Sequence, residues 1–159
     1  MSLTKLKKTD FIPFLDTSDT PETPAWKRID LSTIFSLNPN PQTQTLDYIS
    51  YETPVEEIEK YQPELPQEIA LYEGNPVYDF VFGKFYDLPV GTDTKVPLLV
   101  CFGGSEKKAW RIPQATLVLG ELNTVDGKLS FTLRLSGDIE RGTYTITAGS
   151  PTFTEADAA

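Results

Sequence analysis

Residues 37–88 read LNPNPQTQTLDYISYETPVEEIEKYQPELPQEIALYEGNPVYDFVFGKFYDL, and this stretch decides the fold that the sequence predicts. Two extended, proline-bearing arms, which we place at residues 41–50 and 57–72, flank a turn-like segment at residues 51–55. Segments that alternate and are separated by turn residues are typical of paired strands. The stretch therefore predicts one long β-hairpin, and we set its register by placing Tyr48 near Ile58.

The second arm of this hairpin carries two kinds of side chain in alternation. Leu65, Ile69 and Leu71 are aliphatic, and Glu64 and Glu68 are acidic. Because side chains of a strand point to opposite faces with a period of two, the aliphatic groups share one face and the carboxylates the other. We therefore expect the aliphatic face to lie in the core.

A helix is expected directly after the hairpin. Asn75 is a favoured N-cap residue, and Pro76 fits the first helical position. One apolar stripe with helical spacing follows, at Val77, Phe80, Val81, Phe85 and Leu88, and a second lies beside it, at Tyr78, Phe82 and Tyr86. This apolar arc is wider than the stripe of roughly 100° that an ordinary surface helix buries. The helix is either buried unusually deeply within its own domain or packs on a second partner as well.

The remainder of the chain is rich in strand patterns. Residues 96–102 and 108–122 read as strands, the second with Pro113 at an edge or a bulge. The dipeptide at residues 126–127 is Asp-Gly, which favours a two-residue hairpin turn. The final residues, 150–159, read as an arm or as a disordered tail. We predict a single, mainly β domain over residues 1–159, with a flexible N-terminal segment at residues 1–10.

Composition excludes several classes of function. The chain has 159 residues, a net charge of −9, no histidine and one cysteine, Cys101. An acidic chain disfavours a broad nucleic-acid-binding face, because phosphate binding depends on Lys and Arg. Without histidine, a pair of carboxylates is the remaining route to acid–base catalysis, and the acidic residues read more simply as a solvated face. We expect no enzyme activity, no cofactor and no metal ion.

The order of these segments and their wording resemble a known family. The segments are NPQTQTLDYI at residues 40–49, YQPELPQEIALYEGNPVYDF at residues 61–80 and KKAWR at residues 107–111. They resemble the tail tube (major tail) proteins of long-tailed, non-contractile bacteriophages, and the resemblance extends over residues 10–154. No single motif is diagnostic; the order of the segments carries the resemblance.

The resemblance implies a β-sandwich or barrel with one flanking α-helix and a long β-hairpin. Proteins of this family form hexameric rings, whose inner sheets join into a β-barrel, and the rings stack into the tube through which DNA leaves the capsid. The implied partners are further copies of this chain, the tape measure protein, the tail terminator and the distal tail protein. Double-stranded phage DNA would pass without specific binding, and no membrane is involved. The protein would belong to the virion and be assembled in the host bacterial cytoplasm.

The resemblance also assigns roles to residues of this chain. In a ring, an acidic face would line a channel and repel DNA phosphates. The candidates for the lumen are Glu57, Glu59, Glu64 and Glu68. The candidates for contact between rings are the hairpin residues Tyr48, Ile49, Tyr51, Pro54, Val55 and Ile58. The candidates for contact between subunits are the helix residues Tyr78, Phe82 and Tyr86.

Three other interpretations stay open at the level of sequence. A tube protein of a contractile tail or of a type VI secretion-like system would share this fold and add a sheath partner. A monomeric β-sandwich binding module, for example for carbohydrate, would expose aromatic residues on a concave sheet and would not self-assemble. A small carboxylate-based hydrolase would need two carboxylates at a fixed separation. Self-assembly separates the tube proteins from the last two.

Overall fold

The computed structural model of the protein describes residues 3–18, 25–33 and 36–156. The described residues are mainly β, with one α-helix, α1 (Pro76–Asp87), and two short 3₁₀ helices, η1 (Lys8–Asp10) and η2 (Gly91–Thr94). The strands are β1 (Ile12–Asp16), β2 (Trp26–Arg28), β3 (Pro41–Leu46), β4 (Val55–Tyr61), β5 (Glu64–Ala70), β6 (Lys95–Cys101), β7 (Lys108–Asn123), β8 (Lys128–Arg134), β9 (Glu140–Thr147) and β10 (Ser150–Glu155).

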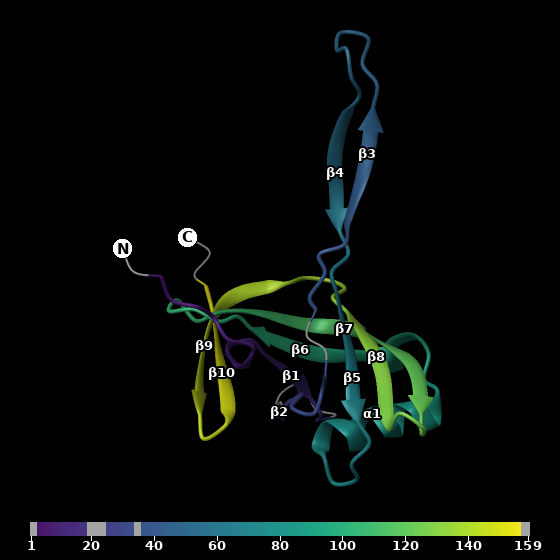
Figure 1. Ribbon diagram of the computed structural model, residues 1–159, viewed down its shortest axis with the longest axis vertical. Helices are drawn as coiled ribbons and strands as arrows, with labels where there is room; N and C mark the ends of the chain where they lie inside the picture. Colours follow the sequence, from purple (N-terminus) through teal and green to yellow (C-terminus); the bar gives the residue numbers. More distant parts are fainter. Residues whose placement is uncertain (1–2, 19–24, 34–35, 157–159) are drawn as a thin grey trace.

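Strand β7 organises the main antiparallel sheet (Figure 1). Along one edge it pairs with β6, and the sheet continues from β6 through β1 to β2. Along its other edge it pairs first with β9 and then with β8, and these strands continue to β10 and β5, respectively. The length of β7 therefore lets one strand hold both halves of the sheet together.

The main core lies on one face of this sheet. Leu15 of β1, Leu65 of β5 and Leu98 of β6 are all fully buried in it, together with Val81 of α1. Burial of each such side chain stabilises the fold by roughly 1.5–3 kcal/mol. Strands β1 and β5 are not neighbours in the sheet, so their shared core requires the sheet to fold over itself in two layers. The predicted mainly β sandwich with one helix is confirmed.

A second, smaller core lies on the opposite face of β1 and β6. It is formed by Phe14, Leu99, Cys101, Ala109 and Tyr144. Residues that alternate along β1 and β6 thus enter two different cores, which is why these strands read as continuous apolar runs.

The helix begins and ends where the sequence indicates. The Asn75 side-chain oxygen accepts hydrogen bonds from the backbone N–H groups of Val77 and Tyr78, each at 3.1 Å. At the other end Leu88 adopts a left-handed conformation with φ of 51°, and its N–H donates to the Lys84 carbonyl oxygen at 2.9 Å. The predicted N-cap is confirmed. Leu88, placed in the core stripe from its spacing, is 69% exposed because it terminates the helix.

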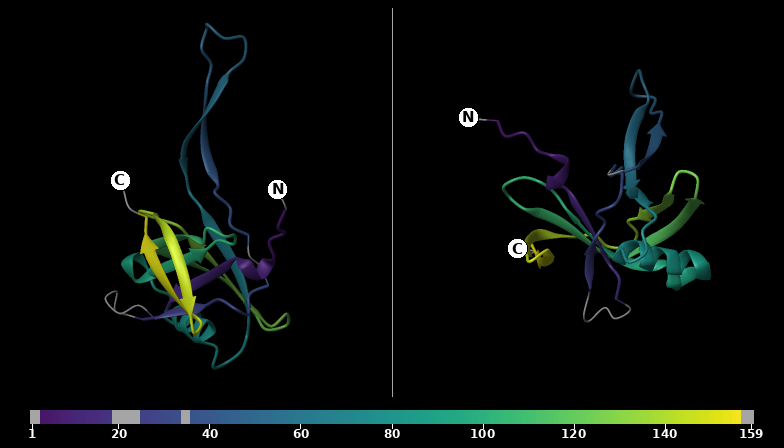
Figure 2. Two further views of the ribbon diagram at one scale, coloured as in Figure 1. Left: turned by 90° about the vertical axis from the view of Figure 1, so that its left-hand side faces the viewer. Right: turned by 60° about the horizontal axis from the view of Figure 1, so that its bottom comes forward.

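The long hairpin is a separate two-stranded sheet formed by β3 and β4, and it projects from the body of the molecule (Figures 1 and 2). The predicted second arm, residues 57–72, is wrong as a single strand, because it divides into β4 and β5 on either side of Gln62 and Pro63. Proline lacks the N–H that a continuous ladder needs.

The predicted hairpin register is also wrong. Ile58 pairs with Thr43, and Leu46 pairs with Val55, so Tyr48 lies in the tip instead of opposite Ile58. The register shifts near the base, between the pairs Gln42–Lys60 and Thr43–Ile58, because Glu59 of β4 is an extra residue there.

Two local predictions for the other strands have different outcomes. Pro113 lies at an irregularity in the β6–β7 ladder, between the paired residues Ile112 and Ala115, as expected for a bulge. A hairpin also forms around residues 126–127, but the two-residue turn is wrong. Asn123 pairs with Lys128, which leaves a four-residue connection, and the Asn123 side chain accepts from the N–H groups of residues 125 and 126.

The ends of the chain differ from expectation in one respect. The sequence predicts an arm or a disordered tail at residues 150–159, but residues 150–155 form strand β10, which pairs with β9 over six positions. The connecting residues Ala148 and Gly149 both have positive φ, 54° and 78°, as a type I′ turn requires. Residues 157–159 of the predicted arm, and residues 1–2 of the N-terminal segment, lie outside the described residues.

Candidate functional site

The tip of the hairpin presents large apolar side chains to solvent. Tyr48 is 47% exposed, Ile49 is fully exposed and Tyr51 is 60% exposed. The Tyr48 and Tyr51 rings contact each other edge to face, with centroids 6.1 Å apart. The sequence-predicted hairpin residues thus divide: three gather at the tip, Pro54 and Val55 follow where β4 begins, and Ile58 lies farther along β4, 53% exposed.

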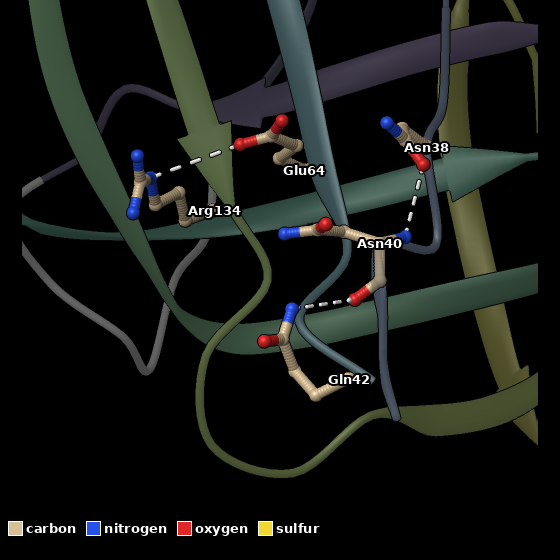
Figure 3. Close-up of polar contacts among 5 residues, drawn as sticks. All are labelled: Asn38, Asn40, Gln42, Glu64 and Arg134. Carbon is tan, nitrogen blue, oxygen red and sulfur yellow. Dashed lines mark hydrogen bonds and ion pairs between the residues drawn. The ribbon is translucent and has the colours of Figure 1, made fainter. Parts of the chain in front are cut away.

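Local polar contacts order the segment that leads into the hairpin, and an ion pair joins the neighbouring strands β5 and β8 (Figure 3). The Asn38 side-chain oxygen accepts from the Asn40 N–H at 2.9 Å, and the Asn40 carbonyl oxygen accepts from the Gln42 side chain at 3.3 Å. The Arg134 Nε atom lies 3.9 Å from a Glu64 carboxylate oxygen. The apolar residues beside this base belong to the body of the molecule, because Leu37 packs against the main core and Leu65 is buried in it.

A two-stranded hairpin that stands alone is only marginally stable in water. In β3 and β4 only Gln42, Leu46 and Val55 are even partly buried. The two strands pair only with each other. A contact that buries the tip would therefore both order the hairpin and remove apolar surface from water, which makes the hairpin the strongest candidate for an assembly surface.

The helix offers a second candidate surface. Val77 and Val81 are buried in the core, and Tyr78, Phe80 and Phe85 pack partly against it. Of the three predicted interface residues, Tyr78 therefore belongs to the edge of the core. Phe82 and Tyr86 are 37% and 79% exposed, and the Phe82 ring stacks on Tyr78 with centroids 5.7 Å apart. Phe82 and Tyr86 form the exposed apolar face of α1.

The predicted lumen residues fall into two separate groups. Glu57 and Glu59 are exposed on the hairpin strand β4. Glu64 and Glu68 are partly buried on β5, on the face opposite the buried Leu65. The alternation predicted for β5 is confirmed, whereas the orientation of either group toward a channel stays a prediction.

Strand β5 has its free edge covered by a preceding segment of the chain. Asn38 exchanges two backbone hydrogen bonds with Glu64, and the Thr33 N–H donates to the Glu68 carbonyl oxygen at 2.9 Å. Covering an edge in this way reduces the risk of uncontrolled pairing between sheets. It also fixes the positions of the two carboxylates relative to the base of the hairpin.

A groove of about 700 Å³ lies beside the loop that joins β6 to β7, and sequence reasoning did not predict it. Phe102 and Trp110 line it with rings edge to face at 5.0 Å, and Lys108 and Arg141 also contribute to its walls. We call it the Trp110 groove. The tryptophan within a basic strand was visible in the sequence, but its juxtaposition with β9 depends on sheet pairing.

The groups with altered acidity lie in the smaller core. Burial raises the pKa of the Cys101 thiol to about 12. Burial also raises the pKa of Tyr144, whose hydroxyl donates to the Phe102 carbonyl oxygen at 3.2 Å. Both groups are therefore neutral at pH 7, and the thiol is a poor nucleophile.

Two other kinds of site are absent from the described residues. No cluster of three or more Cys, Asp or Glu side chains within the described ranges is arranged to hold a metal ion. Over the same ranges, no helix has both the length and the apolar character needed to cross a membrane.

Comparison with known proteins identifies a shared fold. No protein-family model and no curated protein sequence matches this chain. Among solved structures, the chain is similar to a chain from the cryo-EM structure of the anti-feeding prophage baseplate, determined with six-fold symmetry imposed. The two are 13% identical with a TM-score of 0.51, and the match covers 90% of this chain and 98% of the other. The fold of this chain is therefore also found in a phage-tail-related assembly.

Proposed function

We propose that this chain is a structural protein of a phage tail, which forms hexameric rings that stack into the tail tube. The observation that carries the proposal is the isolated hairpin, whose apolar tip at Tyr48, Ile49 and Tyr51 is exposed to water. A monomer gains nothing from this surface. If a neighbouring copy covered it, the contact would be stabilised by roughly 25 cal/mol for each Å² of apolar area removed from water.

The fold supports the same proposal. The anti-feeding prophage chain that it resembles comes from a baseplate solved with six-fold symmetry. A contact between unlike surfaces of identical chains closes into a ring when its rotation closes, and a second such contact along the axis stacks the rings. The hairpin and the exposed face of α1 supply two different surfaces for these two contacts.

The acidic character of the chain suits a conduit for DNA. With a net charge of −9, a ring of identical chains would be strongly negative. Phosphates would be repelled from its wall, so DNA would pass without binding. In this role the chain is not an enzyme, works within the virion, and meets the tape measure protein, the tail terminator and the distal tail protein at the ends of the tube.

Size-exclusion chromatography followed by negative-stain electron microscopy tests the proposal. The full chain is expected to elute as hexamers or larger species and to show rings or hollow tubes. As a matched control, a variant in which residues 42–60 are replaced by a short Gly-Ser linker should stay folded, because this segment contributes nothing to the buried core, but should not assemble. A full chain that stays monomeric at high concentration, with a tail-tip initiator added, would contradict the proposal.

A second candidate function is to form a ring of the baseplate itself, and the similarity in fold to a chain of a baseplate structure favours it. A baseplate ring is present once or a few times in each particle, whereas a tube ring is repeated along the whole tail. Quantitative mass spectrometry of purified particles, with the copies of this chain counted relative to the portal, separates the two functions. The same particles would show whether a sheath is present, which separates a contractile from a non-contractile tail.

A further inference from the structure

The charges of this chain are segregated along its sequence. Residues 41–61, the hairpin, contain five acidic residues and one basic residue. The walls of the Trp110 groove carry two basic residues, Lys108 and Arg141, and one acidic residue, Glu106. Within the described part of the chain, the hairpin carboxylates make no ion pair. The acidic hairpin is therefore available to a basic surface elsewhere.

The Trp110 groove is such a surface. Apolar groups dominate its lining, with Phe102, Ala109 and Trp110 contributed by β7 and the loop before it. Two cationic groups accompany them. The Arg141 guanidinium lies 5.9 Å from the centre of the Trp110 ring and makes no ion pair within the described residues. The Lys108 Nζ atom lies 2.9 Å from a carboxylate oxygen of Glu106, which also lines the groove. Its volume of about 700 Å³ lies within the range of roughly 300–1,000 Å³ of pockets that hold ligands.

The hairpin tip has the complementary properties. Tyr48, Ile49 and Tyr51 supply exposed apolar side chains, and Asp47 and Glu52 flank them with negative charge. Aromatic anchors at the centre, surrounded by a polar rim, are the usual composition of strong contacts between proteins. The hairpin projects away from its own body and pairs only with itself, so the tip is presented to another molecule (Figure 1).

We propose that the Trp110 groove receives the hairpin tip of a second copy of this chain. The inference rests on the proposed function, and it assigns the surface to which the hairpin binds. The contact joins two different surfaces of identical chains, so every copy both gives a hairpin and receives one. Several such contacts act together between two stacked rings, which makes each of them effective although it is small.

Charge reversal tests this contact in the full chain. A tip variant carries Asp47→Lys and Glu52→Lys, and a groove variant carries Lys108→Glu and Arg141→Glu. Each alone is expected to raise the concentration needed for assembly at least tenfold, measured by sedimentation velocity. An equimolar mixture of the two should assemble, because each tip then finds a groove of opposite charge. A control with Glu73→Lys and Glu121→Lys, exposed acidic residues outside both surfaces, should assemble like the unmodified chain.

Cysteine trapping tests the contact directly. Ile49→Cys combined with Thr143→Cys, which lines the groove, should give disulfide-linked chains on mild oxidation. Ile49→Cys combined with Val125→Cys, exposed on the β7–β8 connection, should not. Buried Cys101 does not interfere. If the unmodified chain forms rings while charge reversal has no effect and the cysteine pairs do not differ, the groove assignment is wrong and the proposed function stands. If the unmodified chain forms no rings, the proposed function fails.

Discussion

Gly142 of β9 and Thr154 of β10 lie so close that a Cβ atom on residue 142 would overlap the Thr154 carbonyl oxygen. Gly142 pairs with Ala109 of β7 on one side and with Glu155 of β10 on the other. Both neighbours are backbone ladders, which cannot move aside independently. Residue 142 must therefore lack a side chain for β10 to dock.

Gly142→Ala is expected to release β10 and to destabilise the chain by about 1–3 kcal/mol, the usual cost of overpacking. Hydrogen exchange followed by mass spectrometry should show faster exchange over residues 150–155, with little change in α1. Thr143→Ala, at the adjacent exposed position, is the control and should stay within about 0.5 kcal/mol of the unmodified chain. Unchanged protection of residues 150–155 in Gly142→Ala would show that β10 is not held in this way.

The two faces of α1 are expected to respond differently to substitution. Val81→Ala removes a fully buried side chain and should lower the free energy of unfolding by about 2 kcal/mol. Tyr86→Ala removes a side chain that is 79% exposed and should change it by no more than about 0.5 kcal/mol. Urea denaturation of each variant measures these values.

Assembly should show the reverse order for the same two variants. Tyr86→Ala should reduce the fraction of chain found in rings more than Val81→Ala does, when both are assayed at a temperature where they are folded. Equal losses of stability from the two substitutions would mean that α1 is buried on both faces within one domain.

The sequence predicts those features of this fold that depend on neighbours in the chain. The Asn75 cap and the alternation of Leu65 with Glu64 are confirmed because each depends on local geometry. The tip residues Tyr48 and Tyr51 also stand out as apolar groups in an otherwise polar segment.

Features set by pairing between distant strands were not predictable in the same way. The extra residue of β4, Glu59, shifts the hairpin register, and no single residue there signals it. Strand β10 depends on pairing with β9, although Gly149 was a usable signal for the turn between them. The Trp110 groove needs β7 and β9 side by side, a juxtaposition that becomes known only with the sheet.

Because of Cys101, the stability of the chain is expected to fall at alkaline pH. The pKa of its thiol is 9.0 without burial and about 12 in the folded chain. Between these values the unfolded chain loses the proton and the folded chain keeps it, so stability falls as the pH rises above 9. Urea denaturation at pH 7, 9 and 10 should show this fall in the free energy of unfolding. Measured relative to its own value at pH 7, the free energy of unfolding of Cys101→Ala should fall less over the same pH range.

The same burial predicts how the thiol reacts. At pH 8 a thiol reagent such as Ellman's reagent should modify Cys101 only when urea is added, because the native thiol is both buried and neutral. Rapid modification of the native chain would place Cys101 on an accessible surface.

The carboxylates of Glu64 and Glu68 give the sharpest test of the proposed channel. Both lie on the face of β5 opposite the core, and within the described part of the chain Glu64 forms an ion pair with Arg134, whose side chain is 62% exposed. Such an exposed pair contributes at most about 1 kcal/mol. Glu64→Lys together with Glu68→Lys should therefore leave the chain folded and able to assemble, while it reverses the local charge in every subunit.

Phage that carry this double replacement are expected to build tails of normal length but to eject DNA more slowly, because lysine binds phosphates that glutamate repels. Fluorescence of a dye that binds released DNA follows ejection in time. Glu64→Gln together with Glu68→Gln is the matched control. Its rate of DNA ejection should lie between those of the unmodified phage and the lysine variant, since it removes the negative charge without reversing it. Added salt should reduce the difference, because it screens the charges beyond roughly 8 Å at physiological ionic strength. Normal ejection from the lysine variant would mean that this face of β5 points away from the channel.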